Sequence, residues 1–244
     1  MIDFTVKLAG VAVGVTAFFE TTREFCREYL TGEAPAFSVS LVRDDLVREA
    51  EQSARENLRE GLPVQKYPPQ YLETLALYRK IVEELVNDDI FLFHGSVIAV
   101  DGQGYLFTAK SGTGKSTHTR LWREYFGCRA VMVNDDKPLL RLTDDGVEVC
   151  GTPWDGKHHL STNIAVPLKA VCILERGEKN EINPVSAQEA LPMLLQQSHR
   201  PAAPAQLGKY LGLVNRMSKS VGLYRLRCNM DPEAALVAYD GMKG

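Results

Sequence analysis

The sequence of 244 residues predicts a mixed α/β protein in which hairpins flank a glycine-rich loop. An apolar strand over residues 105–108 enters this loop, and a helical pattern over 115–126 leaves it. The turn residues at 101–104 pair the entering strand with the strand before it, which makes a hairpin. The N-terminal part contains short strands and charged helices without such a loop. We therefore expect an N-terminal α+β part over residues 1–89, packed on an α/β domain over residues 90–244.

The composition is that of an ordinary globular protein. Hydrophobic residues make up 45% of the chain and charged residues 24%, which excludes intrinsic disorder and collagen-like repeats. The 28 basic and 31 acidic residues give a net charge of −3, so the charge balance is not typical of proteins that bind nucleic acid or an anionic membrane. Five cysteines without a CxxC pair indicate reduced thiols. With no bilayer-length apolar stretch and no signal peptide apparent, we expect a cytoplasmic protein without nucleic-acid or membrane partners.

The N-terminal part is predicted to contain short strands followed by two long helices. We expect one or two strands within residues 4–19, a short helix over 21–30 and a strand over 37–42. Charge dominates the segment from Asp44 to Glu60, which indicates a solvated surface helix with i,i+4 charge pairs. Its thin apolar stripe consists of Val47, Ala50, Ala54 and Leu58. A second, amphipathic helix follows from Pro69 to about Val86.

The second part alternates strands and helices around the glycine-rich loop. Its predicted strands are 90–100, 105–108, 130–133, 139–142, 147–150, 170–174 and 223–228, and two of them, 139–142 and 147–150, form a second hairpin. The helix over 115–126 ends at Gly127, which suits the left-handed conformation of a helix C-terminus. Ser186 and Glu189 make a capping box for a helix toward Ser198, and Pro204 begins another helix.

The strongest motif is the glycine-rich loop itself, Ala109-Lys110-Ser111-Gly112-Thr113-Gly114-Lys115-Ser116. It fits the P-loop pattern with Ala109 in place of the first glycine. The glycines permit positive φ, so that backbone N–H groups converge on phosphate oxygens at the positive end of the helix dipole. A glycine-rich turn that only caps a helix needs no Lys-Ser pair after it. We expect ATP and Mg²⁺ as cofactors, with the nucleotide held by Ser111, Gly112, Thr113, Gly114, Lys115, Ser116 and Thr117.

Two adjacent acids, Asp135 and Asp136, follow the buried strand after this helix. A Walker-B-type acid belongs at the carboxyl end of such a strand, where it meets the metal from the opposite side. One acid can hold Mg²⁺ while the other takes a proton from the nucleophile. Because alternation along a strand points successive side chains apart, a kinked strand end is needed for both to face the site. The alternative interpretation is an acidic strand-to-turn junction.

Together these motifs resemble the HPr kinase/phosphorylase and phosphoenolpyruvate carboxykinase clan of P-loop proteins. The resemblance spans residues 94–177 and rests on His94-Gly95, the following hairpin, Ser111–Ser116 and Asn134-Asp135-Asp136, in that order. It implies a P-loop core of the HPr kinase and phosphoenolpyruvate carboxykinase type. It also implies that Asp135 is the general base, that Asp136 and Ser116 bind the metal, that Lys115 binds phosphate, and that His94 lies at the active site beside the acid pair.

The sequence departs from HPr kinases in three ways. Thr117 stands where they usually carry glutamate, their glycine- and arginine-bearing C-terminal signature is not found, and the N-terminal part is too short for their regulatory domain. The chain therefore resembles stand-alone members of the clan of kinase-core size. These include kinases of protein or peptide serines and of free serine.

The expected function is ATP-dependent phosphorylation of a serine hydroxyl in a protein, a peptide or a small molecule. If the clan's reversible chemistry carries over, Asp135 also serves as the acid in phosphorolysis. The alternative is a non-catalytic nucleotide sensor whose N-terminal part supplies the partner surface. A compact carboxykinase is a third hypothesis. The analogy with HPr kinase suggests a homo-oligomer.

Four further residues have two interpretations each. Trp154 and Lys157 belong either to a nucleotide or acceptor pocket or to a surface loop. Arg176 and Arg200 either supply a cation to the transferring group or form surface contacts. The neighbouring His158-His159 pair is not expected to bind a metal, because adjacent residues seldom converge on one ion.

Overall fold

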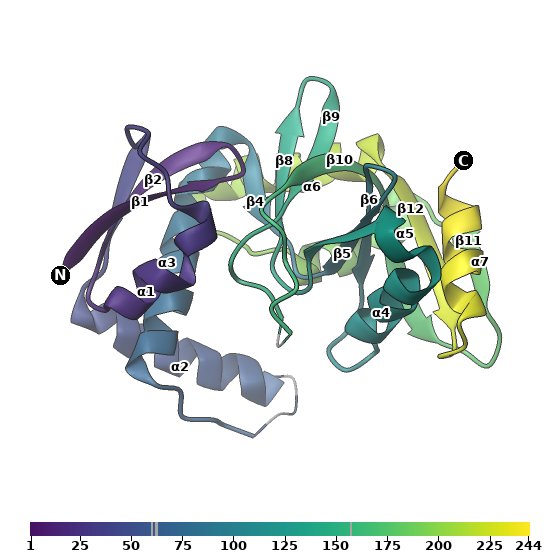
Figure 1. The fold of residues 1–244 in the computed structure, drawn as a ribbon, viewed down its shortest axis with the longest axis horizontal. Coiled ribbons are helices and arrows are strands. Elements are labelled where there is room, and N and C mark those ends of the chain that lie inside the picture. Colours follow the sequence, from purple (N-terminus) through teal and green to yellow (C-terminus); the bar gives the residue numbers. More distant parts are fainter. Residues whose placement is uncertain (60, 62, 157) are drawn as a thin grey trace. The chain divides into compact units, whose positions relative to one another are not determined.

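The computed structural model describes residues 1–59, 61, 63–156 and 158–244, which form two compact units (Figure 1). The first unit is Met1–Glu84 and the second is Leu85–Gly244. Each unit is described by itself.

The described residues of the first unit form a three-stranded sheet and three α-helices. Strands β1 (Ile2–Leu8) and β2 (Val11–Ala17) form an antiparallel hairpin, and β3 (Phe37–Ser40) pairs with β2 in parallel. The predicted strand region 4–19 is thus two strands. The helices are α1 (Glu20–Phe25), α2 (Arg43–Arg59) and α3 (Pro69–Leu85), with a 3-10 turn, η1, at Arg27–Tyr29.

The charged helix α2 buries a polar face, which differs from the prediction. Val47 and Leu58 of the apolar stripe are 59% and 64% exposed. The buried residues of α2 are Asp45, Glu49 and Ser53 instead, and α3 supplies their partners. Arg79 Nε donates to Glu49 Oε2 at 2.8 Å and Lys80 Nζ lies 2.6 Å from Asp45 Oδ2. Buried carboxylates need such partners, so ion pairs hold α2 against α3. Glu60, the last residue of the predicted helix, lies outside the described residues.

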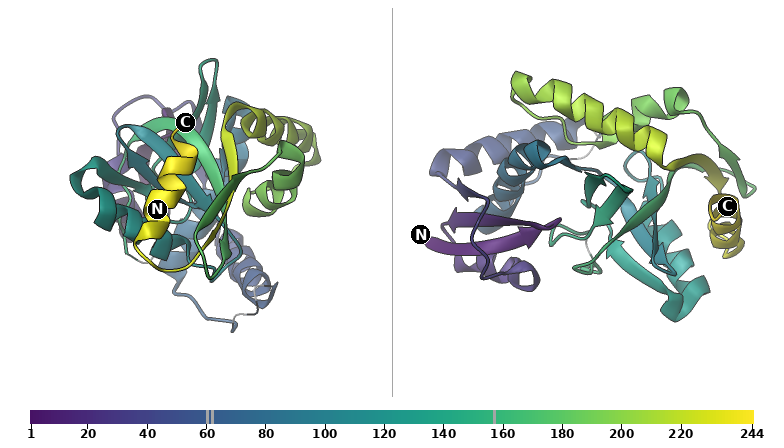
Figure 2. Two further views of the ribbon diagram at one scale, coloured as in Figure 1. Left: turned by 90° about the vertical axis from the view of Figure 1, so that its right-hand side faces the viewer. Right: turned by 90° about the horizontal axis from the view of Figure 1, so that it is seen from above.

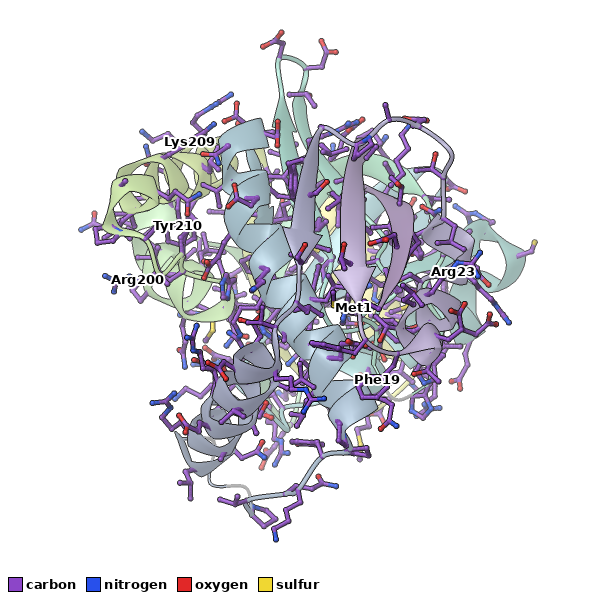
Figure 3. The ribbon with its side chains drawn as sticks, turned by 90° about the vertical axis from the view of Figure 1, so that its left-hand side faces the viewer. Met1, Phe19, Arg23, Arg200, Lys209 and Tyr210 are labelled. Carbon is purple, nitrogen blue, oxygen red and sulfur yellow. The ribbon has the colours of Figure 1, made fainter. Side chains whose placement is uncertain are left out.

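A buried carboxylate also joins α3 to the start of α1. The Glu73 side chain, on a fully buried residue, accepts hydrogen bonds from the backbone N–H groups of Phe18 (2.5 Å) and Phe19 (3.1 Å). It also accepts one from the Thr22 hydroxyl. Phe19, labelled in Figure 3, is the N-cap residue of α1, and its side chain makes no capping hydrogen bond. Glu73 therefore caps α1 from another helix and satisfies donors that the helix end leaves open.

The second unit is built on a mixed sheet, in which the described residues form nine strands. They are β4 (Ile90–Leu92), β5 (Ser96–Val100), β6 (Gln103–Thr108), β7 (Ala130–Asn134), β8 (Leu139–Thr143), β9 (Gly146–Cys150), β10 (Ala165–Arg176), β11 (Glu181–Pro184) and β12 (Gly222–Cys228). The order along the sheet is β4-β8-β9-β10-β6-β5-β7, and β12 pairs with both β10 and β11. Both predicted hairpins are present, as β5–β6 and β8–β9.

Two strands differ from the prediction. The expected strand over 90–100 is split, because β4 pairs with β8 whereas β5 pairs with β6 and β7. The break falls at His94-Gly95, where the chain leaves one half of the sheet and enters the other. A side chain at Gly95 would place its Cβ 2.9 Å from Leu106. Strand β11 was not predicted, since it is short and three of its four residues are exposed.

The long strand β10 joins the two halves of the sheet. Its first residues pair with β9 in antiparallel fashion, and the rest pair in parallel with β6 on one side and β12 on the other. A parallel arrangement of β6, β10 and β12 follows, and β7 runs in the same direction because both it and β6 are antiparallel to β5.

Helices cover both faces of this sheet (Figure 2). On one face lie α4 (Lys115–Phe126) and α7 (Glu233–Met242), and on the other α5 (Ala187–Gln197) and α6 (Pro204–Ser220). Two 3-10 turns complete the unit, η2 (Val86–Asp88) and η3 (Gly127–Arg129). Buried apolar residues form one hydrophobic cluster on each face of the sheet, and each strand contributes to both by alternation. Val97 and Ala99 pack toward α5 and α6, whereas Ile98 and Val100 pack toward α4 and α7. The predicted capping box of α5, Ser186 with Glu189, is confirmed.

The cysteines are all free thiols. Cys26, Cys150 and Cys172 are buried, and burial raises the pKa of the first two to about 12.

Among the described residues, no helix has the length and apolar character needed to cross a membrane.

Candidate functional site

Several chain segments meet at one edge of the second unit because their strands run in the same direction. The carboxyl ends of β6, β7, β10 and β12 all lie at this edge. In open α/β sheets, ligands bind outside the carboxyl ends of the strands. The segments that follow these strands are the loop after β6, the acid pair after β7, Gly177 after β10 and Asn229 after β12.

The loop after β6, residues 109–114, is here called the glycine loop. It connects β6 directly to α4, as predicted, and Gly112 and Gly114 have φ of +75° and +121°. A Cβ added at Gly112 would meet no atom within 4 Å, so this position requires glycine for its backbone conformation and not for space. The Lys115 side chain folds back on the loop, and its Nζ donates to the Ala109 carbonyl at 3.3 Å. Ser111 and Ser116 are exposed.

Arg176, at the end of β10, contacts the glycine loop. Its Nη2 donates to the Gly112 carbonyl at 2.7 Å. This contact is not the surface ion pair of one predicted alternative, and the role of Arg176 as a cation for the transferring group stays a prediction. The neighbouring Glu175 pairs with Arg225 and Arg227 of β12, at 3.2 and 3.3 Å.

Asp135 is buried and connected to α4 through two hydroxyl groups. The Ser96 hydroxyl donates to Asp135 Oδ1 at 2.5 Å and lies 3.0 Å from the Thr119 hydroxyl. Because Ser96 gives its one proton to Asp135, the Thr119 hydroxyl donates either to Ser96 or to a backbone carbonyl of the first turn of α4, that of Lys115 (3.4 Å) or Ser116 (3.3 Å). Among the described residues, no hydrogen bond reaches Asp135 Oδ2. The Ser96 hydroxyl therefore orients the carboxylate through Oδ1.

The strand end at Asn134 has the kink that the acid pair requires. Asn134 Oδ1 accepts from the backbone N–H groups of Asp136 and Lys137, at 2.9 and 2.7 Å, which turns the chain immediately after β7. Asp136 is consequently 40% exposed, whereas Asp135 is buried. Around Asp136 stand His94, with Nδ1 3.9 Å from Oδ1, and Lys137, with Nζ 3.9 Å from Oδ2. The structure thus brings the predicted His94 beside the predicted acid pair.

The loop after β9 packs against Asp135. A Cβ added at Gly156 would lie 3.1 Å from Asp135 Oδ2, so the absence of a side chain there allows the close approach. Asn134 Nδ2 holds this loop through the Thr152 hydroxyl (3.0 Å) and backbone carbonyl (3.1 Å). Trp154 is 3% exposed, which places its ring in the interior and not at a surface. Lys157 lies outside the described residues.

The remaining candidates lie apart from these contacts. His159 Nδ1 is 2.9 Å from Asp155 Oδ1, and Asp155 also accepts from the backbone and hydroxyl of Ser161. Arg200 is exposed on the connection between α5 and α6 (Figure 3). Across the described parts of the chain, no group of three or more His, Cys, Asp or Glu side chains is arranged to hold a metal ion.

A cavity of about 510 Å³ opens beside the glycine loop. Its walls come from the loop, from α4, and from the ends of β10 and β12. The lining residues are Gly112, Thr113, Gly114, Thr117, His118, Leu121, Leu174, Glu175, Arg176, Gly177, Cys228, Asn229 and Met230. Cavities of this size are typical of small-molecule sites.

His118 is a buried member of this lining. Its Nε2 accepts a hydrogen bond from Trp122 Nε1 at 3.0 Å, and its ring packs edge-on against Phe107 at 4.6 Å between centroids. Burial lowers the pKa of His118 to about 4. The side chain is therefore neutral at physiological pH.

This burial predicts a specific dependence of stability on pH. Because the pKa of His118 is lower in the folded chain than in the unfolded chain, its contribution is complete above the unfolded value near 6.5 and is lost as the pH falls toward about 4. Between about pH 7 and about pH 5, the free energy of unfolding of the wild type should fall by about 2 kcal/mol more than that of His118→Gln. Urea denaturation followed by tryptophan fluorescence measures both. An equal loss in the two proteins would contradict a buried neutral His118.

The sequence did not single out Ser96 or Thr119 as members of the site, and it placed Gly156 only within a segment, between Trp154 and Lys157, that belongs either to a pocket or to a surface loop. Ser96 had a signal, since a hydroxyl follows His94-Gly95 at the start of an otherwise apolar strand. Thr119 lies four residues after Lys115, which places it on the same face of α4. The contact of Gly156 with Asp135 had no local signal, because it depends on how the loop after β9 folds back.

The fold and this edge define a mixed α/β protein in which a glycine loop and an acid pair lie at the carboxyl ends of parallel strands. The chain belongs to the ScmC family, described as SynChlorMet cassette protein ScmC, whose profile matches residues 69–232.

The chain is also similar to the structure of the Hpr(Ser) kinase/phosphatase from Coxiella burnetii. The two have 11% sequence identity and a TM-score of 0.38, and the match covers 63% of this chain and 99% of the other. None of the curated proteins compared with the chain matches it.

Proposed function

We propose that this protein is an ATP-dependent kinase that phosphorylates a serine hydroxyl of a protein, a peptide or a small molecule. The observation that carries the proposal is the strand–loop–helix unit, in which Gly112 and Gly114 have positive φ and Lys115 opens the helix. Such a loop directs backbone N–H groups toward an anion at a helix N-terminus. The sequence resemblance to HPr kinases supports the same reaction.

Lys115 and the glycine loop bind the phosphates in this proposal. The Lys115 ammonium now contacts the Ala109 carbonyl, a neutral acceptor at 3.3 Å. A phosphate oxygen is a stronger, charged acceptor for the same group. Arg176 stabilises the backbone conformation of the loop by donating a hydrogen bond to the Gly112 carbonyl. Phosphoryl transfer depends on positioning and on charge stabilisation, and these groups supply both.

The chain also offers the ligands that Mg²⁺ prefers. Mg²⁺ is usually bound by one or two protein oxygens together with substrate phosphates, so a full cage of side chains is not required. Ser116 supplies an exposed hydroxyl at the first turn of α4, and Asp136 supplies a half-exposed carboxylate after β7. Bound there with the nucleotide, the ion would neutralise charge on the transferred group.

Asp135 is the general base of the proposed reaction. Its Oδ1 accepts a hydrogen bond from the Ser96 hydroxyl, which orients the carboxylate, and in this proposal Oδ2 takes the proton of the substrate hydroxyl. The base removes the proton of the serine hydroxyl as its oxygen attacks the γ-phosphorus and the bond to ADP breaks. Ser96 acts as a positioning residue and does not touch the reacting atoms.

The test is a transfer assay with the full-length protein. Purified protein is incubated with Mg²⁺ and γ-labelled ATP, alone and with HPr, free serine or a pool of serine-containing peptides. We expect label in one acceptor and none with the Lys115→Ala variant, which loses the phosphate contact. Nucleotide binding without transfer to any acceptor would favour the nucleotide sensor over the kinase. No nucleotide binding at all would overturn both.

A further inference from the structure

One residue in the lining of the cavity beside the glycine loop, His118, has a buried ring nitrogen without a hydrogen-bond partner among the described residues. His118 is 3% exposed, and its Nδ1 has no hydrogen bond with any described residue. A buried polar atom in this state is unusual and destabilising, because folding removes it from water without replacing the lost contact. The same residue lines the cavity, at the point where α4 leaves the glycine loop.

The hydrogen bond from Trp122 fixes which nitrogen of His118 carries the proton. The indole Nε1–H can only donate, so His118 Nε2 must be the acceptor. A neutral imidazole then carries its proton on Nδ1. The Nδ1–H of His118 is therefore an unsatisfied donor, and the missing partner must be an acceptor.

We propose that this cavity binds the nucleobase of the nucleotide and that His118 Nδ1–H donates to an acceptor atom of the base. The inference rests on the proposed function, because the phosphates must lie on the glycine loop for the base to reach the cavity. Gly112 and Gly114 belong to both the loop and the cavity wall, so the two sites are continuous.

The other walls suit a flat heterocycle. Leu121 of α4 and Leu174 of β10 are buried apolar residues, and Met230, also in the lining, is 76% exposed. A base buries its faces against such side chains, and methionine sulfur makes favourable contacts with aromatic rings. Ring nitrogens and carbonyl oxygens of a base lie in its plane, where a single N–H donor selects them. A phosphate or a sugar lacks the apolar faces that these walls favour.

The test compares three ligands that share their phosphates, using the full chain and isothermal titration calorimetry. Inorganic tripolyphosphate tests the glycine loop alone, ribose 5-triphosphate adds the sugar, and ATP adds the base. We expect the wild type to bind ATP at least about tenfold more tightly than ribose 5-triphosphate. This comparison needs no variant, so it stands even if substitutions at His118 prevent folding.

Two substitutions then test the donor. In His118→Gln the longer amide reaches the Nε2 position and still accepts from Trp122, but no donor remains at Nδ1. In His118→Asn the shorter amide places a donor near the Nδ1 position. We expect His118→Gln to weaken ATP binding about tenfold and His118→Asn to retain most of the affinity, with tripolyphosphate binding unchanged in both.

The outcomes separate the two proposals. Equal affinity of the wild type for ATP and ribose 5-triphosphate would overturn the nucleobase site and leave the phosphate site standing. Equal ATP affinity of wild type and His118→Gln would overturn the role of the Nδ1–H donor. No binding of tripolyphosphate or ATP would overturn the proposed function, and the nucleobase site with it.

Discussion

Replacing Asp135 with asparagine should lower the rate of phosphoryl transfer by about 10²- to 10⁴-fold, the range that general bases contribute. Asparagine keeps the size of the side chain and an oxygen that accepts from Ser96, so the fold and nucleotide binding should persist. What is lost is the carboxylate that accepts the proton from the substrate hydroxyl. Single-turnover transfer of labelled phosphate measures the loss, and titration with ADP checks that binding is retained.

Asp144→Asn is the matched control for this substitution. Asp144 is exposed in the turn between β8 and β9, away from the carboxyl edge of the parallel strands. This variant should transfer phosphate at the rate of the wild type. A loss of less than tenfold in Asp135→Asn would contradict the role of Asp135 as general base.

Replacing Glu73 with leucine should lower the free energy of unfolding of the first unit by about 3–5 kcal/mol. The carboxylate accepts from two backbone N–H groups, at Phe18 and Phe19, and from the Thr22 hydroxyl. All of these donors would remain in the folded state without a partner, and the N-terminus of α1 would lose its cap.

Hydrogen exchange is the suitable measurement for this variant. Both tryptophans, Trp122 and Trp154, belong to the second unit, so their fluorescence does not report on the first. The amides of α1 and β2 should exchange faster in Glu73→Leu. Glu84 is exposed in the last turn of the same helix, α3, so Glu84→Leu is the control and should leave these exchange rates unchanged. Equal exchange in Glu73→Leu and wild type would refute the capping role.

Local sequence patterns predicted most helices and strands of the fold, because residues within a few positions of one another determine where these elements begin and end. The helix over 115–126, its glycine terminus and both hairpins follow from periodicity and turn residues within a few positions. The helix α2 was placed correctly, but its buried face was not. The acids Asp45 and Glu49 are inside because Lys80 and Arg79 of another helix meet them, and no pattern within α2 records that.

The candidate site shows the same division. The order of the motifs placed the glycine loop and the acid pair, and the kink after β7 follows from Asn134, whose side chain turns the next two residues. The contacts between distant segments were not predictable. Ser96 meets Asp135 across 39 positions and Arg176 meets Gly112 across 64, and both depend on the order of strands in the sheet.

The alternation of β5, β6 and β10 between the two hydrophobic clusters has a consequence for how the second unit comes apart. Val171 and Ile173 of β10 pack on one face, and Ala170, Cys172 and Leu174 on the other. If either layer of helices detached, apolar side chains on one face of these strands would be exposed to water. The same strands would then be less stable as the surface on which the opposite layer packs. The two layers should therefore melt in one cooperative step, and the carboxyl edge that carries the glycine loop and the acid pair should lose its geometry all at once.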